Sequence, residues 1–239
     1  MNLTGKRVLA IAHEPDGQPG QIAVRMTQRG MIVDTHLVTA DYNEPNQAAV
    51  FPDWRDYDVI VPMGSVRSVA NKDQIDTWVY DEADMLRAAT AADRPILGIC
   101  FGGQLLADSL GGSAQHAAID EIGWFRIDAP TGATNPAGPG PWFEWHHDCF
   151  TAPPQAQVLA QNDRATQLFR MGTSVGTQFH PEVDVNHITG FLNGSEPEYL
   201  QRNGIDRRAM LAEAARHESA AIERAHRFVD WFLDDVAFG

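Results

Sequence analysis

A cysteine between glycines is the stretch of this sequence with the clearest chemical potential. The run GICFG places Gly98, Cys100 and Gly102 where an apolar segment, residues 95–100, gives way to a helix-like pattern. This order has the form of a nucleophile elbow, a tight strand-to-helix turn that holds a reactive side chain clear of the backbone. The N-terminal amides of the following helix favour a thiolate over a thiol. Taken alone, the motif also fits a core cysteine in a glycine-rich turn.

A cysteine nucleophile needs a base, and the base needs a group that orients it. The segment TQFHPEVD supplies His180 and Glu182, and Pro181 between them restricts His180 to an extended conformation. In an extended segment, residues two apart point the same way, so both side chains can face one site. His180 would exchange protons with the sulfur and the leaving group, and Glu182 would hold the imidazole in the useful tautomer. Alone, His-Pro-Glu is more often a turn; its meaning here comes from coexistence with the elbow.

A glycine-containing loop could complete such a site with hydrogen-bond donors. The segment VPMGSVRSVAN follows an apolar run and places Gly64 next to Ser65. Beside the elbow, its backbone N–H groups could face the oxygen of a tetrahedral intermediate. The candidate oxyanion donors are therefore the amides of Ser65 and of Phe101, the residue after the cysteine.

Charge and hydropathy exclude two classes of partner. The 239 residues include 32 acidic and 18 basic side chains, a formal net charge of -14, whereas phosphate backbones bind basic surfaces. We therefore expect no nucleic-acid partner. No apolar run reaches the roughly 20 residues that span a bilayer, so we expect no membrane contact, and the N-terminal apolar stretch is too short for a signal peptide. These features predict a cytoplasmic protein in which Cys100 and Cys149 stay as free thiols.

The elements that must position these residues alternate between strand-like and helix-like patterns in the first half of the chain. Short apolar runs indicate buried strands over residues 7–12, 31–38, 56–64 and 95–100. Helical spacing follows the first, third and fourth of these runs, over 20–30, 75–90 and 101–112. Such alternation is typical of βαβ units and a parallel sheet. The predicted fold class is therefore α/β.

The second half has shorter elements. From about residue 118, strand-like stretches are separated by dense turn signals, and residues 129–141, rich in Gly and Pro, indicate a loop or a lid. Near the C-terminus, helical spacing predicts a terminal helix packed on the sheet, in preference to a partner-binding helix; its apolar face comprises Leu211, Ala215, Ile222, Ala225, Val229 and Phe232. We expect one domain, 1–239, with a C-terminal helical extension over 206–236.

Together the motifs resemble the class I glutamine amidotransferases, the triad-type family with a Cys-His-Glu site. The resemblance rests on H-P-E at residues 180–182, on the glycine loop at Gly64, and on G-x-C-x-G-x-Q, here Gly98, Cys100, Gly102 and Gln104. These motifs occur in the family's order. The segment DEIGWFRI at residues 120–127 is similar to one found in stand-alone bacterial members.

The resemblance implies an open flavodoxin-like fold, with a mostly parallel sheet and helices on both faces, that hydrolyses the side-chain amide of glutamine. Cys100 would form a γ-glutamyl thioester, His180 would protonate departing ammonia and later activate water, and Glu182 would support His180. No cofactor and no metal is expected. The residues implied to bind the substrate are Gly64, Gln104, His146, His147 and Asp148.

Three of those residues admit a second interpretation. His146, His147 and Asp148 could be metal ligands, because imidazole and carboxylate suit zinc or iron. Adjacent histidines in a strand point to opposite faces, however, so at most one of them can share a site with Asp148. Substrate contacts are the preferred interpretation. Cys149 has no glycine elbow around it and is expected to pack as a small apolar side chain.

The acceptor half of an amidotransferase reaction is not evident, since no G-x-x-x-x-G-K-[ST] phosphate loop occurs. Three functions stay open: a glutaminase that supplies ammonia to a separate synthetase partner, a free-standing hydrolase of γ-glutamyl amines or peptides, and a catalytically silent scaffold, which the intact triad disfavours. If residues 129–141 and 190–205 are lids that enlarge the pocket, they favour the second function, whose leaving group is larger than ammonia.

Overall fold

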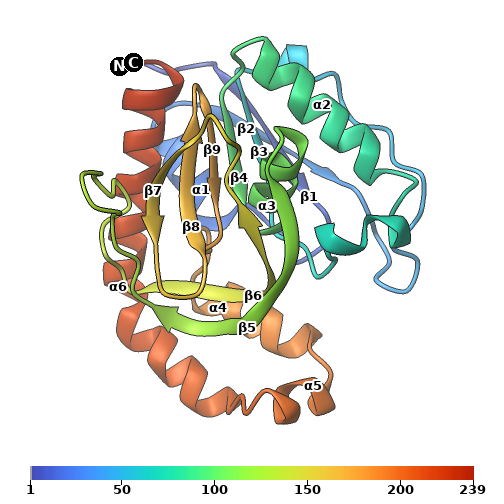
Figure 1. Ribbon diagram of the computed structural model, residues 1–239, viewed down its shortest axis with the longest axis vertical. Helices are drawn as coiled ribbons and strands as arrows, with labels where there is room; N and C mark the ends of the chain where they lie inside the picture. Colours follow the sequence, from blue (N-terminus) through green and yellow to red (C-terminus); the bar gives the residue numbers. More distant parts are fainter. Residues whose placement is uncertain (1) are drawn as a thin grey trace.

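One sheet organises the computed structural model, which describes residues 2–239. Within those residues its strand order is β2-β1-β3-β4-β9-β8-β7 (Figure 1). The strands β2 (Ile32–Leu37), β1 (Arg7–Ala12), β3 (Val59–Pro62), β4 (Ile96–Ile99) and β9 (Ser174–Thr177) are parallel. The strands β8 (Thr166–Met171) and β7 (Gln157–Gln161) continue the sheet in antiparallel fashion. The predicted mostly parallel sheet is confirmed.

Helices cover both faces of the sheet, as predicted (Figure 1). On one face lie α1 (Gly20–Gln28) and α6 (Arg207–Trp231), and on the other lie α2 (Val79–Ala91) and α3 (Phe101–Ser109). The strands divide their side chains between the two cores: Val8 packs with α1 and α6, whereas Leu9 and Ile11 pack with α2 and α3. Burial on both faces explains why these strands are continuous apolar runs in the sequence.

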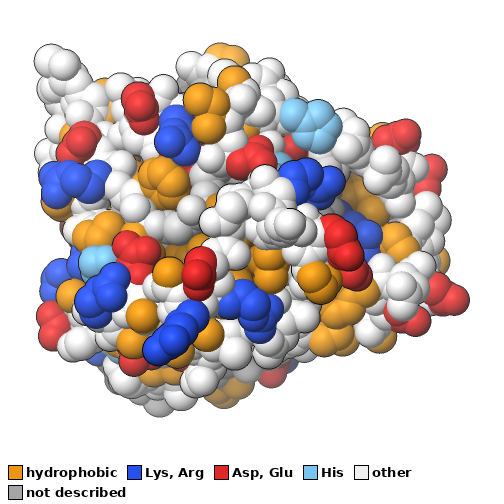
Figure 2. Space-filling view, turned by 90° about the horizontal axis from the view of Figure 1, so that it is seen from below, with side chains coloured by type: hydrophobic (Ala, Val, Ile, Leu, Met, Phe, Trp, Pro, Cys, Tyr) orange, Lys and Arg blue, Asp and Glu red, His pale blue; other side chains and the backbone are white. Residues whose placement is uncertain are grey.

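A hairpin and two short helices lie at one end of the sheet (Figure 1). The hairpin pairs β5 (Ser113–Phe125) with β6 (Trp142–Thr151), with an irregular register between His116 and Glu121. The short helices are α4 (Val185–Gly194) and α5 (Pro197–Arg202). Figure 2 looks onto this end of the molecule, where acidic and basic side chains are interspersed. The chain also has short 3-10 helices at Trp54–Asp56 and Val69–Gln74 and a π-helical segment at Phe232–Ala237.

The long helix α6 is present, and its predicted apolar face is correct towards its C-terminus, where Ala225, Val229 and Phe232 are buried. In its first half the face is shifted by one residue, because Ala214 and Ala221 are buried there in place of Ala215 and Ile222. This first half packs against α4, whereas the second half packs against α1. Ion pairs to Asp230 from Arg25 of α1 and from Arg29, the residue after α1, at 2.7 and 2.6 Å, hold its second half. Among the helices of residues 2–239, none has both the length and the apolarity to cross a membrane.

Candidate active site

The turn between β4 and α3 holds Cys100 in an unusual backbone conformation. Its φ of 49° and ψ of -107° lie outside the regions that side-chain-bearing residues favour. A Cβ on Gly102 would lie 2.1 Å from the carbonyl oxygen of Pro62, and one on Gly98 would lie 2.7 Å from the carbonyl oxygen of Gly102. Both glycines are therefore required sterically. Cys100 is only 4% exposed, yet it lines a cavity rather than packing wholly into the core.

His180 follows β9, lines the same cavity and is paired with Glu182. Its Nδ1 lies 2.7 Å from Oε1 of Glu182, and both side chains are buried. Burial lowers the pKa of His180, but attraction to Glu182 and to Cys100 outweighs it and raises the pKa well above the usual value. Its Nε2 is buried and makes no hydrogen bond within residues 2–239. That nitrogen is thus available for proton exchange at the sulfur and at a bound ligand.

The loop after β3 contacts the elbow directly. The N–H of Gly102 donates to the carbonyl of Met63 at 3.0 Å. A Cβ on Gly64 would lie 3.1 Å from Cε1 of His180 and 3.8 Å from Cβ of Cys100, so this glycine lets the loop approach both. The structure thus brings the glycine loop beside the elbow, as the sequence analysis predicted.

The two candidate oxyanion donors line one cavity. Ser65 and Phe101 both contribute to its wall. Neither backbone N–H donates a hydrogen bond to any part of the chain that the structure describes. Both amides are therefore available to a ligand oxygen.

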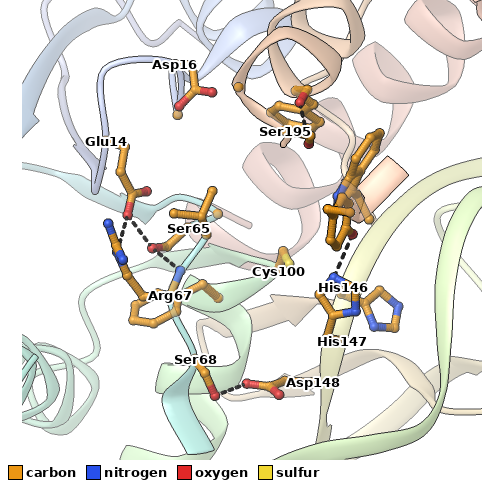
Figure 3. Close-up of a pocket in the computed structure, with 18 of the residues that line it drawn as sticks. Glu14, Asp16, Ser65, Arg67, Ser68, Cys100, His146, His147, Asp148 and Ser195 are labelled. Atoms are coloured by element: carbon orange, nitrogen blue, oxygen red, sulfur yellow. Dashed lines mark hydrogen bonds and ion pairs between the residues drawn. The ribbon is translucent and has the colours of Figure 1, made fainter. Parts of the chain in front are cut away.

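The cavity around Cys100 has a volume of about 690 Å³. In Figure 3, Cys100 lies between Glu14, Ser65 and Arg67 on one side and His146 and His147 on the other. The segment 190–205 forms the end of α4 and all of α5, and it does line the cavity. Residues 129–141 line no part of it and form only the connection between β5 and β6.

The cavity wall includes acidic residues that the sequence analysis missed. Glu14 accepts a hydrogen bond from Oγ of Ser65 at 2.8 Å and lies 3.6 Å from Nε of Arg67. Burial raises the pKa of Glu14. Asp16 and Tyr42 lie further along the same wall. A usable signal was present, because Glu14 follows β1 at the carboxyl edge of the sheet, where ligands of open α/β sheets bind.

Gln104 and Asp148, two residues that the resemblance implies for substrate binding, lie together. The side-chain amide of Gln104 donates to the backbone carbonyl of Asp148 at 3.0 Å and to Oε1 of Gln178 at 3.3 Å. The Asp148 carboxylate accepts from Oγ of Ser68 at 2.5 Å and lies 2.6 Å from Nδ1 of His116. The Asp148 carboxyl is therefore held in place at the cavity wall, and the Gln104 side chain is bonded to its neighbours.

His146 and His147 point to opposite sides of β6, as expected for neighbours in a strand. His146 is buried, whereas His147 is exposed and lies 2.7 Å from both Oδ2 of Asp120 and Oη of Tyr199. The two imidazoles therefore do not converge with Asp148. Across residues 2–239, no group of three or more His, Cys, Asp and Glu side chains is arranged to hold a metal ion. Cys149 is half-buried in β6, and burial raises the pKa of its thiol.

A family model for class-I glutamine amidotransferases matches residues 21–190. The chain belongs to the class-I glutamine amidotransferase family. The glutamine amidotransferase-like protein YfeJ of Salmonella typhimurium is 26% identical over 235 residues, which cover 94% of this chain and 96% of that protein. The glutamine-hydrolyzing GMP synthase of Sulfurisphaera tokodaii has one subunit that is 31% identical over 62% of this chain and 83% of its own length.

Solved structures share the fold. A glutamine amidotransferase from Thermotoga maritima superposes with a TM-score of 0.81 at 24% identity, covering 96% of this chain and 98% of that chain. A glutamine amidotransferase from Methylobacillus flagellatus gives a TM-score of 0.79 at 20% identity, covering 98% of this chain and 96% of that one. The predicted family and the predicted flavodoxin-like fold are both confirmed.

In this member of the class-I glutamine amidotransferase family, a second buried acid–base cluster lies beside the first. Nε2 of His146 lies 3.4 Å from Oε2 of Glu121 and 3.3 Å from Oε2 of Glu144. Burial lowers the pKa of His146, but the two carboxylates outweigh it and raise the pKa to about 10. Burial raises the pKa of Glu144 to about 7. Glu121 accepts hydrogen bonds from the side chains of Asn162 and Gln167, whereas the Glu144 carboxyl oxygens have no hydrogen-bond donor within residues 2–239.

Replacing Glu144 by Gln should stabilise the protein relative to wild type as the pH rises. The pKa of Glu144 moves from 4.5 to about 7 on folding. The folded state therefore binds the extra proton, and wild-type stability falls between those pH values. Gln cannot ionise, so Glu144→Gln does not lose stability in this way. Its free energy of unfolding, relative to that of wild type, should therefore rise by on the order of 3 kcal/mol between these two pH values.

Urea unfolding followed by circular dichroism across this pH range measures the gain. Asp84→Asn, which removes a carboxyl that is 72% exposed, controls for the change in net charge. A difference between Glu144→Gln and wild type that does not change with pH would contradict the role of burial.

Proposed function

We propose that this protein hydrolyses the side-chain amide of glutamine through a covalent intermediate on Cys100. The observation that carries the proposal is the buried 2.7 Å contact between His180 and Glu182, with Nε2 of His180 unbonded in the cavity that Cys100 lines. A nucleophile, a base and an orienting carboxylate in this order form a triad. Membership of the family supports glutamine as the substrate.

In the proposed reaction, the Cys100 sulfur attacks the amide carbon and a tetrahedral intermediate forms. His180 gives its proton to the nitrogen, the C–N bond breaks, and ammonia leaves a γ-glutamyl thioester. Water then loses a proton to His180 and attacks the thioester carbon, the C–S bond breaks, and glutamate leaves. The amides of Ser65 and Phe101 donate to the carbonyl oxygen while it is negatively charged. Each step uses only nucleophilic and acid–base chemistry.

We further propose that the ammonia serves a separate synthetase partner. The support is the likeness to one subunit of a glutamine-hydrolyzing GMP synthase. A small-molecule substrate and a cytoplasmic location stay predictions from the sequence. Gly64, Gln104, His146, His147 and Asp148 are the proposed substrate-binding residues, since all of them line the cavity.

The purified protein should release ammonia and glutamate in equal amounts from L-glutamine, and Cys100→Ser should release almost none. The hydroxyl is a far weaker nucleophile at neutral pH, so we expect a loss of at least about a thousandfold in kcat. A coupled glutamate assay measures the rate. Cys149→Ser, at the other free cysteine, is the matched control and should keep wild-type activity. Near wild-type activity in Cys100→Ser would refute the triad.

Glu182→Gln should lower kcat less than His180→Ala. In the first variant the amide oxygen of the new side chain can still accept the Nδ1 proton of His180 and keep its tautomer, whereas the second variant lacks the proton carrier altogether. We expect losses of about tenfold to a hundredfold and of more than about a thousandfold, respectively. Steady-state kinetics on glutamine measure both. Equal losses would mean that the orienting role belongs to another residue.

A second candidate function is favoured by the size of the cavity and by its aromatic wall. About 690 Å³ falls in the range of pockets for ligands larger than glutamine. Trp145 lies between Phe191 and Tyr199, with ring centres 5.8 and 6.4 Å away, and all three side chains line the cavity. Ammonia is too small a leaving group to contact these rings. The amine part of a γ-glutamyl amide of an aromatic amine could pack against them.

If the hydrolase function is the physiological one, γ-glutamyl benzylamide should be cleaved with a higher kcat/KM than glutamine. Tyr199→Ala should then lower kcat/KM for the benzylamide about fivefold, because a ring contact contributes about 1 kcal/mol, and should leave glutamine hydrolysis unchanged. Tyr80→Ala, at an exposed tyrosine of α2 outside the cavity, is the control. Hydrolysis of glutamine alone would exclude this function.

A further inference from the structure

A buried glutamine side chain contacts the sulfur of the candidate nucleophile. Gln178 lies two residues before His180 and is fully buried. Its Nε2 lies 3.7 Å from Sγ of Cys100, and the two atoms are hydrogen-bonded. Cys100 lines the cavity and Gln178 does not, so the amide reaches the sulfur without being part of the cavity wall. The contact therefore takes no space from a ligand.

The backbone alone places Gln178 beside the Cys100 turn. The N–H of Cys100 donates to the carbonyl of Thr177 at 2.9 Å, and the N–H of Gln178 donates to the carbonyl of Gln167 at 2.9 Å. These bonds continue the pairing of β9 with β4 and with β8. A buried amide side chain costs free energy unless it is hydrogen-bonded, whereas an apolar side chain would fill the space without that cost. Gln178 is therefore best explained by the bonds that its amide makes.

The hydrogen-bond network determines which end of the Gln178 amide faces the sulfur. Nε2 of Gln104 donates to the backbone carbonyl of Asp148 at 3.0 Å. Because a carbonyl can only accept, this end of the Gln104 side chain is its NH2 group. The same nitrogen donates to Oε1 of Gln178 at 3.3 Å. The oxygen of Gln178 is thus held at Gln104, and its NH2 group faces Cys100.

The charged groups around Cys100 act on the sulfur together with this neutral donor. Attraction to Cys100 contributes to the raised pKa of both His180 and His146, so both imidazoles favour a negative sulfur. The carboxyl groups around these residues are Glu182, beside His180, Glu121 and Glu144, beside His146, and Glu14 and Asp148 of the cavity wall. An amide does not titrate, so Gln178 donates to the sulfur at every pH, and a hydrogen bond to an anion is stronger than one to a neutral group.

We propose that Gln178 is a catalytic residue that stabilises the thiolate of Cys100 by donating a hydrogen bond to Sγ, and that Gln104 is a positioning residue that holds the Gln178 amide in the donating orientation. The inference rests on the proposed function, in which the sulfur anion attacks the amide carbon and forms again when the C–S bond of the thioester breaks. In both states the electron pair lies on sulfur. The amide of Gln178 gives up no atom in either step.

Alkylation of Cys100 by iodoacetamide tests the proposal, because the thiolate is the form that displaces iodide. Cys149→Ser serves as the background, since Cys149 is the other free thiol. Gln178→Met has nearly the same shape and no donor, so the pH midpoint of alkylation should rise by about one unit and the rate below the midpoint should fall about tenfold. The plateau at high pH should not fall. An unmoved midpoint, or an equal loss at every pH, would overturn the proposal.

Thr177→Val is the matched control. Thr177 is buried next to Gln178, and its hydroxyl donates to the carbonyl of Phe179 at 2.9 Å. This variant also removes a buried polar group beside the Cys100 turn, but it keeps the donor to the sulfur, so the alkylation midpoint should stay at its value in the background protein. A shift as large as that of Gln178→Met would show that any such loss suffices, and the proposal would fail.

Gln104→Met tests the positioning role. Without the bond from Gln104, the amide of Gln178 can rotate and turn its oxygen to the sulfur, so the alkylation midpoint should rise. In the double variant Q104M/Q178M the midpoint should equal that of Gln178→Met alone, because Gln104 acts through Gln178. Two shifts that simply add would contradict this role. Thermal unfolding checks that each variant is folded at the assay temperature.

These measurements need no turnover of glutamine, so failure of this proposal can be told from failure of the proposed function. If glutamine is hydrolysed, the acidic limb of kcat/KM against pH should move in Gln178→Met by the same amount as the alkylation midpoint. Nuclear magnetic resonance on the Cys149→Ser protein with ¹⁵N-labelled glutamine decides the matter even if Gln178→Met does not fold. The side-chain N–H signal of Gln178 should shift as the sulfur ionises, with the midpoint of alkylation. A signal that does not respond to this ionisation overturns the proposal.

Discussion

The close contact between the ends of β3 and β4 is the constraint on which the site depends. Gly102 lies so near the carbonyl of Pro62 that no side chain fits, and its amide donates to Met63. Neighbouring parallel strands end at one edge of a sheet, so this contact places the Cys100 turn beside the glycine loop before any ligand binds. The strand β9 pairs with the other side of β4 and leads to His180. The order β3-β4-β9 in the sheet is thus the spatial order of the candidate donor loop, the candidate nucleophile and the candidate base.

Buried histidines paired with carboxylates surround this edge. His180 is held by Glu182, His13 by Glu82, and His146 by two glutamates of the hairpin. In a low-dielectric interior an imidazole stays charged only beside an anion, and the pKa of each of these histidines is raised despite burial. Each of these imidazoles is thus matched by at least one carboxylate beside it. Composition alone does not reveal this local pairing.

Local pattern predicted the parts of the site that depend on short segments. The strand over residues 7–12 has the expected bounds, and the cysteine elbow and the His-Pro-Glu segment are each recognisable within a few residues. The buried pair of His13 and Glu82 was not predictable, because these residues are 69 positions apart and meet only through the fold. The strand β5 begins at Ser113, well before the predicted stretch, because its first half is largely exposed and lacks an apolar signal. Contacts between residues that are far apart in the sequence produce no periodic pattern from which they could be predicted.

The cavity lies between two parts of the molecule that have different apolar clusters. The catalytic candidates stand on the sheet edge, above the two main cores, whereas the opposite wall comes from β6, α4 and α5, which enclose a third apolar cluster around Phe143, Ile188 and Leu192. That wall is tied together by its own contacts, including the hydrogen bond between His147 and Tyr199. The same wall contacts the candidate base, because the backbone N–H of His180 donates to the carbonyl of Phe143 at 2.9 Å and the rings of His180 and Phe191 lie 5.6 Å apart. A change in the α4–α5 wall is therefore transmitted to the candidate triad through His180, so the shape of the cavity and the position of the imidazole are coupled.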